Sequence, residues 1–358
     1  MTRRIIFTGG GTAGHVTPNM ALIDELLAAH WVVHYVGSNS GIERRLITPM
    51  GIDFHGIATG KLRRYFSWQN FIDPLYILWG FCQSLLLCLR LRPNVVFSKG
   101  GFVAVPIVVA AWLLRIPVIS HESDTTPGLA NKLCFPFCRW ICVNFPQTTE
   151  HLPVGKVLLT GSPLRAGLLH GNAERARQDF GLAMDKPVLL IFGGSLGANV
   201  INQAVRQNLE VLLDEFQIVH VVGAGNLLPA LADTQGYLQC DYINEGFGDL
   251  LALADLVIAR AGANTIYEML ITRTPHILVP LSAAASRGDQ LINAQIFADA
   301  GFSEVIAESE LTDERLLTCI QQTYSRREAI HQRLLSFEIK DSVAIITDLI
   351  RRAADRSD

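Results

Sequence analysis

The sequence contains no apolar run long enough to span a membrane. A spanning helix needs about 20 consecutive apolar residues, whereas the longest candidate, Leu75–Leu89, is shorter and contains Gln83. Arg3 and Arg4 lead directly into a strand-like run, so no secretory leader is recognised. We therefore expect a cytoplasmic protein. Hydrophobic residues make up 49% of the chain and charged residues only 18%, which is enough apolar material for large cores.

Residues that define three common nucleotide and metal sites are also missing. The GxGxxG pattern at Gly9–Gly14 matches dinucleotide-binding proteins, but the next predicted strand ends in Val36–Asn39 without the acid that holds a ribose. The same stretch resembles a P-loop, but His15 replaces the phosphate-binding lysine. No Asp-x-Asp pair occurs, so the usual metal chelate of a nucleotide-sugar diphosphate is absent. The seven cysteines suit buried thiols in a reducing compartment, and we expect no metal and no cofactor.

The net charge of −3 conceals an asymmetry between the two halves of the chain. Residues 1–160 carry 14 Lys or Arg against 8 Asp or Glu, and the remaining residues carry 16 against 25. A basic half beside an acidic half indicates that the first half faces an anionic partner. We expect that partner to be a substrate or a membrane, with no nucleic acid.

Short apolar runs that suit buried parallel strands alternate with helical patterns along the chain. The plan restarts at residues 188–199, where VLLIFGGSLGAN repeats the strand, glycine turn and helix of residues 5–15. We predict an α/β fold of two Rossmann-like, doubly wound domains that face each other across a cleft. The predicted domains are 1–162 and 163–334, with a C-terminal helix at about 335–358 that can pack back on the first. The predicted strands are Ile5–Thr8, Val32–Val36, Val95–Ser98, Val118–Ser120, Trp140–Val143, Val188–Phe192, Ile218–Val222, Leu256–Ala259 and His276–Val279.

Matched glycine turns in both halves indicate anion binding. Glycine lets the backbone approach a ligand closely, and a helix N-terminus offers unpaired N–H groups with about half a positive charge. Two further polar segments follow later strands: Arg260–Glu268, and a helix start at 286–294 in which Gln290 and Asn293 share one face. Glu268 lies one to two turns into its helix, where it can accept hydrogen bonds from ribose hydroxyls, or else face solvent.

Seven ordered motifs resemble the bacterial glycosyltransferases that form lipid II, the MurG family. This resemblance spans nearly the whole chain and implies the GT-B fold, inversion at the anomeric carbon and no chelated metal for the donor. It also implies transfer of N-acetylglucosamine from UDP-GlcNAc to undecaprenyl-pyrophosphoryl-N-acetylmuramyl-pentapeptide at the inner membrane face. The motifs are GGTAGHVTP (10–18), KGGFV (99–103), HESD (121–124) with PGLANK (127–132), GSPLR (161–165), GGSLGA (193–198), RAGANT (260–265) with Glu268, and Asp289-Gln290 with Asn293-Ala294.

The resemblance assigns the donor mainly to the second domain. It implies that Gly194, Ser195 and Arg165 face the diphosphate, that Glu268 holds the ribose, and that Ile243 reads the uracil edge. Gln290 and Asn293 are implied contacts of the sugar hydroxyls. The further implied substrate-binding residues are Thr12, Ala13, Gly14, Asn131, Arg260, Ala263, Asn264 and Thr265.

The acceptor hydroxyl must lose a proton as it attacks the sugar. His15 is the first candidate for the base, because an imidazole with an ordinary pKa near 6.5 can accept a proton near neutrality. Asp124 and Glu122 are the alternatives, and His15 could instead bind only the acceptor phosphate. Many members of the family have Asn where Asp124 stands, so contacts assigned to that position depend on this difference.

A basic and aromatic segment precedes the apolar run of the first half. Lys61–Trp68 and the following stretch to Arg92 suit an anionic membrane interface or, alternatively, an ordinary core helix with charged flanks. We predict peripheral binding to the cytoplasmic face of the cell membrane. A UDP-GlcNAc 2-epimerase, another GT-B glycosyltransferase and a non-catalytic UDP-sugar-binding subunit are the alternative functions.

Overall fold

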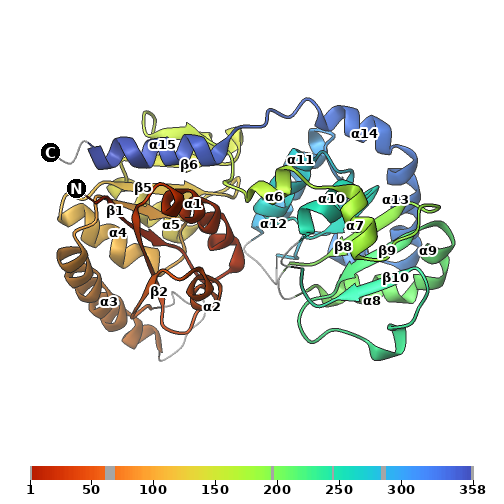
Figure 1. Cartoon of the computed structure of the whole chain (residues 1–358), viewed down its shortest axis with the longest axis horizontal. Coiled ribbons are helices and arrows are strands. Elements are labelled where there is room, and N and C mark those ends of the chain that lie inside the picture. Colours follow the sequence, from red (N-terminus) through yellow and green to blue (C-terminus); the bar gives the residue numbers. More distant parts are fainter. Residues whose placement is uncertain (1, 61–68, 195–196, 244–245, 284–287, 356–358) are drawn as a thin grey trace. The chain divides into compact units, whose positions relative to one another are not determined.

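The computed structural model describes residues 2–60, 69–194, 197–243, 246–283 and 288–355 (Figure 1). The chain divides into two compact units. Unit 1 comprises residues 1–165 and 340–358, and unit 2 comprises residues 166–339. Among the described residues, no helix has both the length and the hydropathy needed to cross a bilayer.

Unit 1 is built on a parallel sheet of seven strands in the order β3-β2-β1-β4-β5-β6-β7. Its central strands are buried apart from Arg4 at the start of β1, as expected for a sheet covered on both faces, and their polar residues lie mainly at the carboxyl ends. The strands are β1 (Arg4–Thr8), β2 (Val32–Ser38), β3 (Asp53–Ile57), β4 (Val95–Ser98), β5 (Val118–Glu122), β6 (Trp140–Val143) and β7 (Val157–Leu159).

Helices cover both faces of this sheet. The α helices are α1 (Thr17–Ala28), α2 (Ile42–Ile47), α3 (Gln69–Leu91), α4 (Ala104–Leu113), α5 (Leu129–Cys134) and α15 (Ser342–Asp355). The 3-10 helices are η1 (Ala13–His15), η2 (Thr48–Met50), η3 (Phe135–Phe137) and η4 (Pro146–His151).

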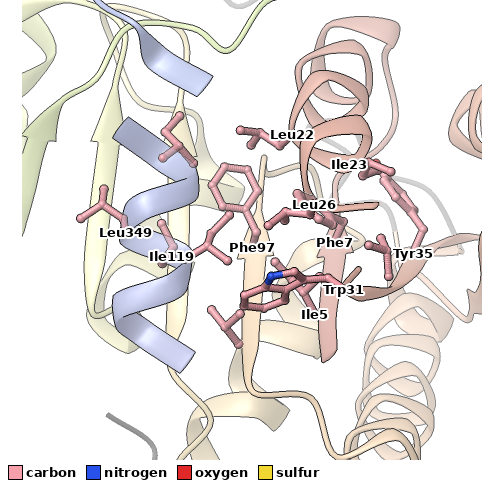
Figure 2. Packing of buried hydrophobic residues seen from close by; sticks show 14 of the residues in the cluster. Ile5, Phe7, Leu22, Ile23, Leu26, Trp31, Tyr35, Phe97, Ile119 and Leu349 are labelled. Atoms are coloured by element: carbon pink, nitrogen blue, oxygen red, sulfur yellow. The ribbon is translucent and has the colours of Figure 1, made fainter. Parts of the chain in front are cut away.

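The last helix of the chain, α15, completes the core of unit 1. Ile346, Leu349 and Ile350 join one buried cluster with residues of β1, α1, β2, β4 and β5. Figure 1 shows the blue α15 beside the red α1. Figure 2 shows ten labelled side chains of the cluster, including Leu349 of α15 with Phe97 and Ile119 of the sheet. The chain therefore returns to unit 1 after building unit 2.

Unit 2 repeats the plan with a parallel sheet of six strands in the order β10-β9-β8-β11-β12-β13. The strands are β8 (Val188–Phe192), β9 (Gln217–Val221), β10 (Tyr237–Cys240), β11 (Leu256–Ala259), β12 (His276–Leu278) and β13 (Glu304–Val305). The helices are α6 (Ala166–Leu169), α7 (Ala173–Asp179), α8 (Asn199–Gln207), α9 (Leu209–Glu215), η5 (Pro229–Leu231), α10 (Phe247–Leu253), α11 (Ala263–Thr272), α12 (Asp289–Asp299), η6 (Glu308–Glu310), α13 (Asp313–Ser325) and α14 (Arg327–Leu334).

All nine predicted strands are present, with ends that differ by at most two residues. The four strands that the sequence pattern did not predict, β3, β7, β10 and β13, are the edge strands of the two sheets. Edge strands have one neighbour and carry polar residues, as in β3, where Asp53 and His55 interrupt the apolar pattern. The predicted two-domain α/β fold is confirmed.

Candidate functional site

In unit 1 the glycine turn lies where the strand order of the sheet reverses. Chain order runs outward in opposite directions from β1 and β4, and ligands of doubly wound sheets bind at the carboxyl ends of such strands. The turn after β1 contacts the turn after β4, since the Gly10 N–H donates to the Gly100 carbonyl at 3.3 Å. Gly101 has φ of +84°, and a Cβ there would lie 2.4 Å from the Gly10 carbonyl oxygen. Only glycine allows this close approach.

His15 ends the turn with a defined ring orientation. Its Nδ1 lies 3.0 Å from the Gly10 carbonyl oxygen and 3.4 Å from the Thr12 hydroxyl. A carbonyl can only accept, so we assign the ring proton to Nδ1. Nε2 then carries the lone pair, which is the form that a general base requires. The predicted residues Thr12, Ala13, Gly14 and His15 thus belong to one turn, which includes η1.

A buried carboxylate beneath the turn was not among the predicted site residues. Glu43 is fully buried and accepts from the Ser38 N–H at 2.8 Å and the Ser38 hydroxyl at 2.5 Å. Its other oxygen accepts from the Gly11 N–H at 3.3 Å. A Cβ on Gly10 would lie 2.7 Å from this carboxyl group. Glu43 therefore fixes the glycine turn to the end of β2.

Glu122, one of the alternative bases, has buried hydrogen-bond partners. It ends β5 and accepts from the N–H groups of Asp124 at 3.0 Å and Gly128 at 3.1 Å. The Asn131 amide donates to the same carboxylate at 2.8 Å. Glu122 and Asn131 therefore hold the 123–128 loop, while Asp124 is only partly buried. Of the two carboxylates, Asp124 is the more accessible to a substrate.

Lys99 lies beneath the same loop and is buried. Its Nζ is 2.6 Å from His121 Nδ1 and also donates to the Ser123 hydroxyl. His121 Nε2 lies 2.9 Å from the Gly161 carbonyl, which assigns the ring proton to Nε2. Burial lowers the pKa of Lys99 to about 7, although Glu122 and Asp124 oppose that effect. Lys99 is the first residue of the KGGFV motif, but the motif does not predict that the lysine contacts His121 and Ser123.

In unit 2 the second glycine turn also lies at a reversal of strand order, between β8 and β11. Gly193 and Gly194 follow β8, and the Gly197 N–H donates to the Gly194 carbonyl at 2.9 Å. Gly197 has φ of +74°, and a Cβ there would lie 2.0 Å from the Val222 carbonyl oxygen. Ser195, a predicted diphosphate contact, lies outside the described residues.

The segment after β11 brings several predicted residues to the same end of this sheet. Ala263, Asn264 and Thr265 form the first turn of α11. Arg260 is buried and donates to the Val279 carbonyl at 3.1 Å and to Glu308 at 2.7 Å. These partners give Arg260 a structural role, joining the end of β11 to the segments around Val279 and Glu308. Its predicted substrate contact stays a prediction.

Glu268 lies on α11, and its carboxylate differs from those of Glu43 and Glu122 in its surroundings. Among the described residues, no group forms a hydrogen bond or ion pair with its carboxylate, and burial raises its pKa to about 7. Burial without a partner disfavours the charged form. A ligand with hydroxyl groups would supply the missing donors.

The remaining predicted donor residues lie on α12 and beside α10. The Gln290 side-chain oxygen accepts from the Leu281 N–H at 3.0 Å, and the buried Asn293 amide donates to the Ala261 carbonyl at 3.4 Å. Ile243 is partly buried against the core of unit 2. Arg165 ends the first segment of unit 1, where its guanidinium lies 3.4 Å from the Met20 sulfur of α1.

Two models of one protein family match the chain, one in each unit. Residues 5–143 match the glycosyltransferase family 28 N-terminal domain, and residues 188–344 match the glycosyltransferase family 28 C-terminal domain. The solved structure of MurG from Acinetobacter baumannii shares the fold with a TM-score of 0.76 at 24% identity, covering 98% of this chain and 99% of that one. A putative UDP-N-acetylglucosamine 2-epimerase from Listeria monocytogenes shares it with a TM-score of 0.67 at 11% identity, covering 100% and 98%. The fold is therefore the GT-B fold.

Two curated relatives resemble the chain over its full length. A protein of Clostridium botulinum strain Langeland is 47% identical over 98% of this chain and 99% of its own. A protein of Geobacillus thermodenitrificans is 46% identical over 99% and 100%. Both are named UDP-N-acetylglucosamine–N-acetylmuramyl-(pentapeptide) pyrophosphoryl-undecaprenol N-acetylglucosamine transferase. The chain belongs to glycosyltransferase family 28.

Proposed function

We propose that this protein transfers N-acetylglucosamine from UDP-GlcNAc to undecaprenyl-pyrophosphoryl-N-acetylmuramyl-pentapeptide in peptidoglycan synthesis. The observation that carries the proposal is the 47% identity over nearly the full length of a relative named for this reaction. In this scheme unit 1 binds the acceptor and supplies the base, and unit 2 binds the donor.

The donor assignment is supported by the groups at the β8 and β11 ends of unit 2. The N-terminus of α11 would offer backbone N–H groups to an anion, and the glycines after β8 would let the backbone approach it closely, which suits the diphosphate. Glu268 would accept from the ribose hydroxyls, since its carboxylate has no other hydrogen-bond donor among the described residues. Gln290 and Asn293 would contact the sugar from α12, where the Gln290 oxygen also accepts from the Leu281 N–H and the Asn293 amide also donates to the Ala261 carbonyl.

In the reaction the acceptor oxygen forms a bond to the anomeric carbon while the bond to the UDP oxygen breaks. The proton of the attacking hydroxyl passes to His15 Nε2, and the electron pair of the broken bond leaves with UDP. The hydrogen bond from Nδ1 to the Gly10 carbonyl stabilises the imidazolium that forms. Helix N-termini and Arg165 would take up the charge that develops on UDP.

A 2-epimerase with the same fold is the main alternative, and one experiment separates the two. The protein is incubated with UDP-GlcNAc, with and without the lipid-linked acceptor, and the products are separated. We expect a disaccharide-bearing lipid and free UDP only when the acceptor is present. Formation of UDP-ManNAc without acceptor would contradict the transferase.

We also propose that unit 1 binds the cytoplasmic face of the membrane through its α3–α5 side. Adjacent helices expose large apolar side chains there, and Trp79 is 60% exposed. A sheet-covering helix normally turns such residues inward, so an exposed apolar group marks a contact surface. The exposed residues are Leu75, Tyr76, Leu78, Trp79, Leu86 and Leu89 of α3, Trp112 and Leu113 of α4, and Leu129 and Leu133 of α5. Residues 61–68, predicted to extend this surface, lie outside the described residues.

Flotation with vesicles that contain anionic lipid tests the membrane surface. Trp79→Glu with Leu75→Glu is expected to reduce the bound fraction several-fold, because charged groups are costly at an apolar interface. Met184→Glu, at an apolar residue of unit 2 that is even more exposed, is the control and should bind like the parent. Equal flotation of all three proteins would refute the proposed surface.

A further inference from the structure

Three metal-ligating side chains meet at the β2–β3 edge of unit 1, away from the turns described above. His34 and Asp53 are direct partners in the register of the two strands, and Val36 pairs with His55. Because side chains alternate along a strand, His34, Asp53 and His55 all point to the face of the sheet that α3 covers. One donor atom from each of the three lies within 4.8 Å of the other two.

The spacing of these atoms fits a tetrahedral metal better than a set of hydrogen bonds. His34 Nδ1 is 3.4 Å from His55 Nε2 and 3.3 Å from the nearer Asp53 oxygen. Hydrogen bonds between such groups are commonly about 2.7–3.2 Å. Two ligands bound to one tetrahedral zinc at about 2.0–2.1 Å lie about 3.3–3.4 Å apart. Both distances match the edge of a zinc coordination tetrahedron, and the third, between Asp53 and His55, is within 4.8 Å.

The protonation of these side chains also favours a bound metal over direct hydrogen bonds. His34 Nδ1 faces two groups at once, and a single N–H cannot donate fully to both. If Nδ1 is unprotonated, its lone pair faces the carboxylate of Asp53, which is unfavourable. A cation between the three atoms would satisfy all of them with neutral imidazoles.

The surroundings favour neutral imidazoles and leave the centre open to solvent. Burial lowers the pKa of His34, with His55 and Arg4 acting in the same direction, and burial with Arg90 lowers the pKa of His55. Asp53 opposes both shifts. Arg4 donates to the Leu91 carbonyl at 3.2 Å, and Arg90 is exposed. The Asp53 side chain is 74% exposed, so an ion has a path from solvent.

We propose that His34, Asp53 and His55 form a site for one Zn²⁺ ion, with water as the fourth ligand. The ion would join the edge strand β3 to β2. The site is independent of the donor and of the glycine turns, so the proposal does not depend on the proposed function.

Zinc titration of the full-length protein, after removal of metals with a chelator, tests the proposal. The variants are Asp53→Asn and His55→Gln, with His170→Gln as a control at an exposed histidine of unit 2. A Cys82→Ser/Cys240→Ser protein controls for the two cysteines that are not fully buried. Cobalt(II) serves as the spectroscopic probe, because four-coordinate nitrogen and oxygen ligation differs visibly from thiolate ligation.

We expect one zinc per chain in the parent, the His170 control and the cysteine variant. Asp53→Asn and His55→Gln should each weaken binding more than tenfold, and cobalt should show visible bands without a thiolate band. Zinc should also raise the urea midpoint of the parent, followed by tryptophan fluorescence, but not that of Asp53→Asn. Equal affinity in all variants, or binding lost only with the cysteines, would overturn the site.

Discussion

Glu268 gives a prediction in which stability and donor binding change in opposite directions. Burial raises the pKa of this carboxylate from 4.5 to about 7, and no described group offers it a hydrogen bond. Its folded pKa lies above its unfolded value. Its contribution to stability is therefore fully present below pH 4.5 and is lost as the pH rises through 7. Because the side chain is only partly buried and solvent screens part of the effect, the ionised carboxylate costs unit 2 at most about 3 kcal/mol at pH 8.

Glu268→Gln removes that cost, since an amide does not ionise. At pH 8 the variant is expected to be more stable than the parent, and at pH 4.5 the difference should largely disappear. All five tryptophans lie in residues 1–165, so tryptophan fluorescence does not report on unit 2. Hydrogen exchange followed by mass spectrometry on peptides of α11 measures the difference directly.

Donor affinity should change in the opposite direction. With a pKa of about 7, roughly one tenth of Glu268 is ionised at pH 6 and nine tenths at pH 8. If the carboxylate accepts from the ribose, affinity for UDP-GlcNAc should rise about tenfold between these pH values, and the variant should show no such rise. UDP-GlcNAc is the ligand of choice because, unlike UDP, it has no terminal phosphate that titrates near pH 6.

Calorimetry at pH 6, 7 and 8 provides the assay. A parent whose affinity falls or stays constant over this range would refute the role of the ionised carboxylate. The same rise in parent and variant would show that another group titrates.

Two further predictions concern buried groups of unit 1. Tryptophan fluorescence does report on the unfolding of this unit. The parent Lys99 loses its proton near pH 7 when folded and near pH 10.5 when unfolded, so the free energy of unfolding should rise above pH 7 by at most about 1.4 kcal/mol per pH unit. Lys99→Met should abolish this rise. An equal change in the free energy of unfolding of parent and variant between pH 7 and pH 8.5, measured by urea titration, would exclude this. Glu43→Gln should cost about 1–3 kcal/mol in the same assay, because an amide cannot accept from the Ser38 N–H, the Ser38 hydroxyl and the Gly11 N–H together. An unchanged midpoint would show that this carboxylate does not hold the turn.

The interior of the fold was predictable from the sequence, and its edges were not. Strands such as β8, VLLIF, are buried on both faces and read as continuous apolar runs. The edge strand β13 has only two residues, Glu304 and Val305, which is too short a segment to show an apolar or alternating pattern. Its pairing with β12 arises from tertiary structure rather than from local pattern.

The candidate site shows a similar division. Glycine turns after apolar strands are local patterns, so Gly9–His15 and the turn at Gly193 were found directly. Glu43 and Lys99 depend on partners that the sheet brings together from distant positions, as when Lys99 meets His121 on the neighbouring strand. The cluster of His34, Asp53 and His55 was missed for the same reason, since it depends on strand register.

The central claim is that the unit 1 turn supplies the base for transfer to the lipid acceptor. It is tested most directly by UDP release from UDP-GlcNAc and the lipid-linked acceptor, measured with parent, His15→Ala and His170→Ala proteins, with donor affinity measured alongside. We predict that His15→Ala lowers turnover about 100-fold or more, while donor affinity stays within about twofold of the parent and His170→Ala behaves like the parent. Turnover of His15→Ala equal to that of the parent would contradict the account.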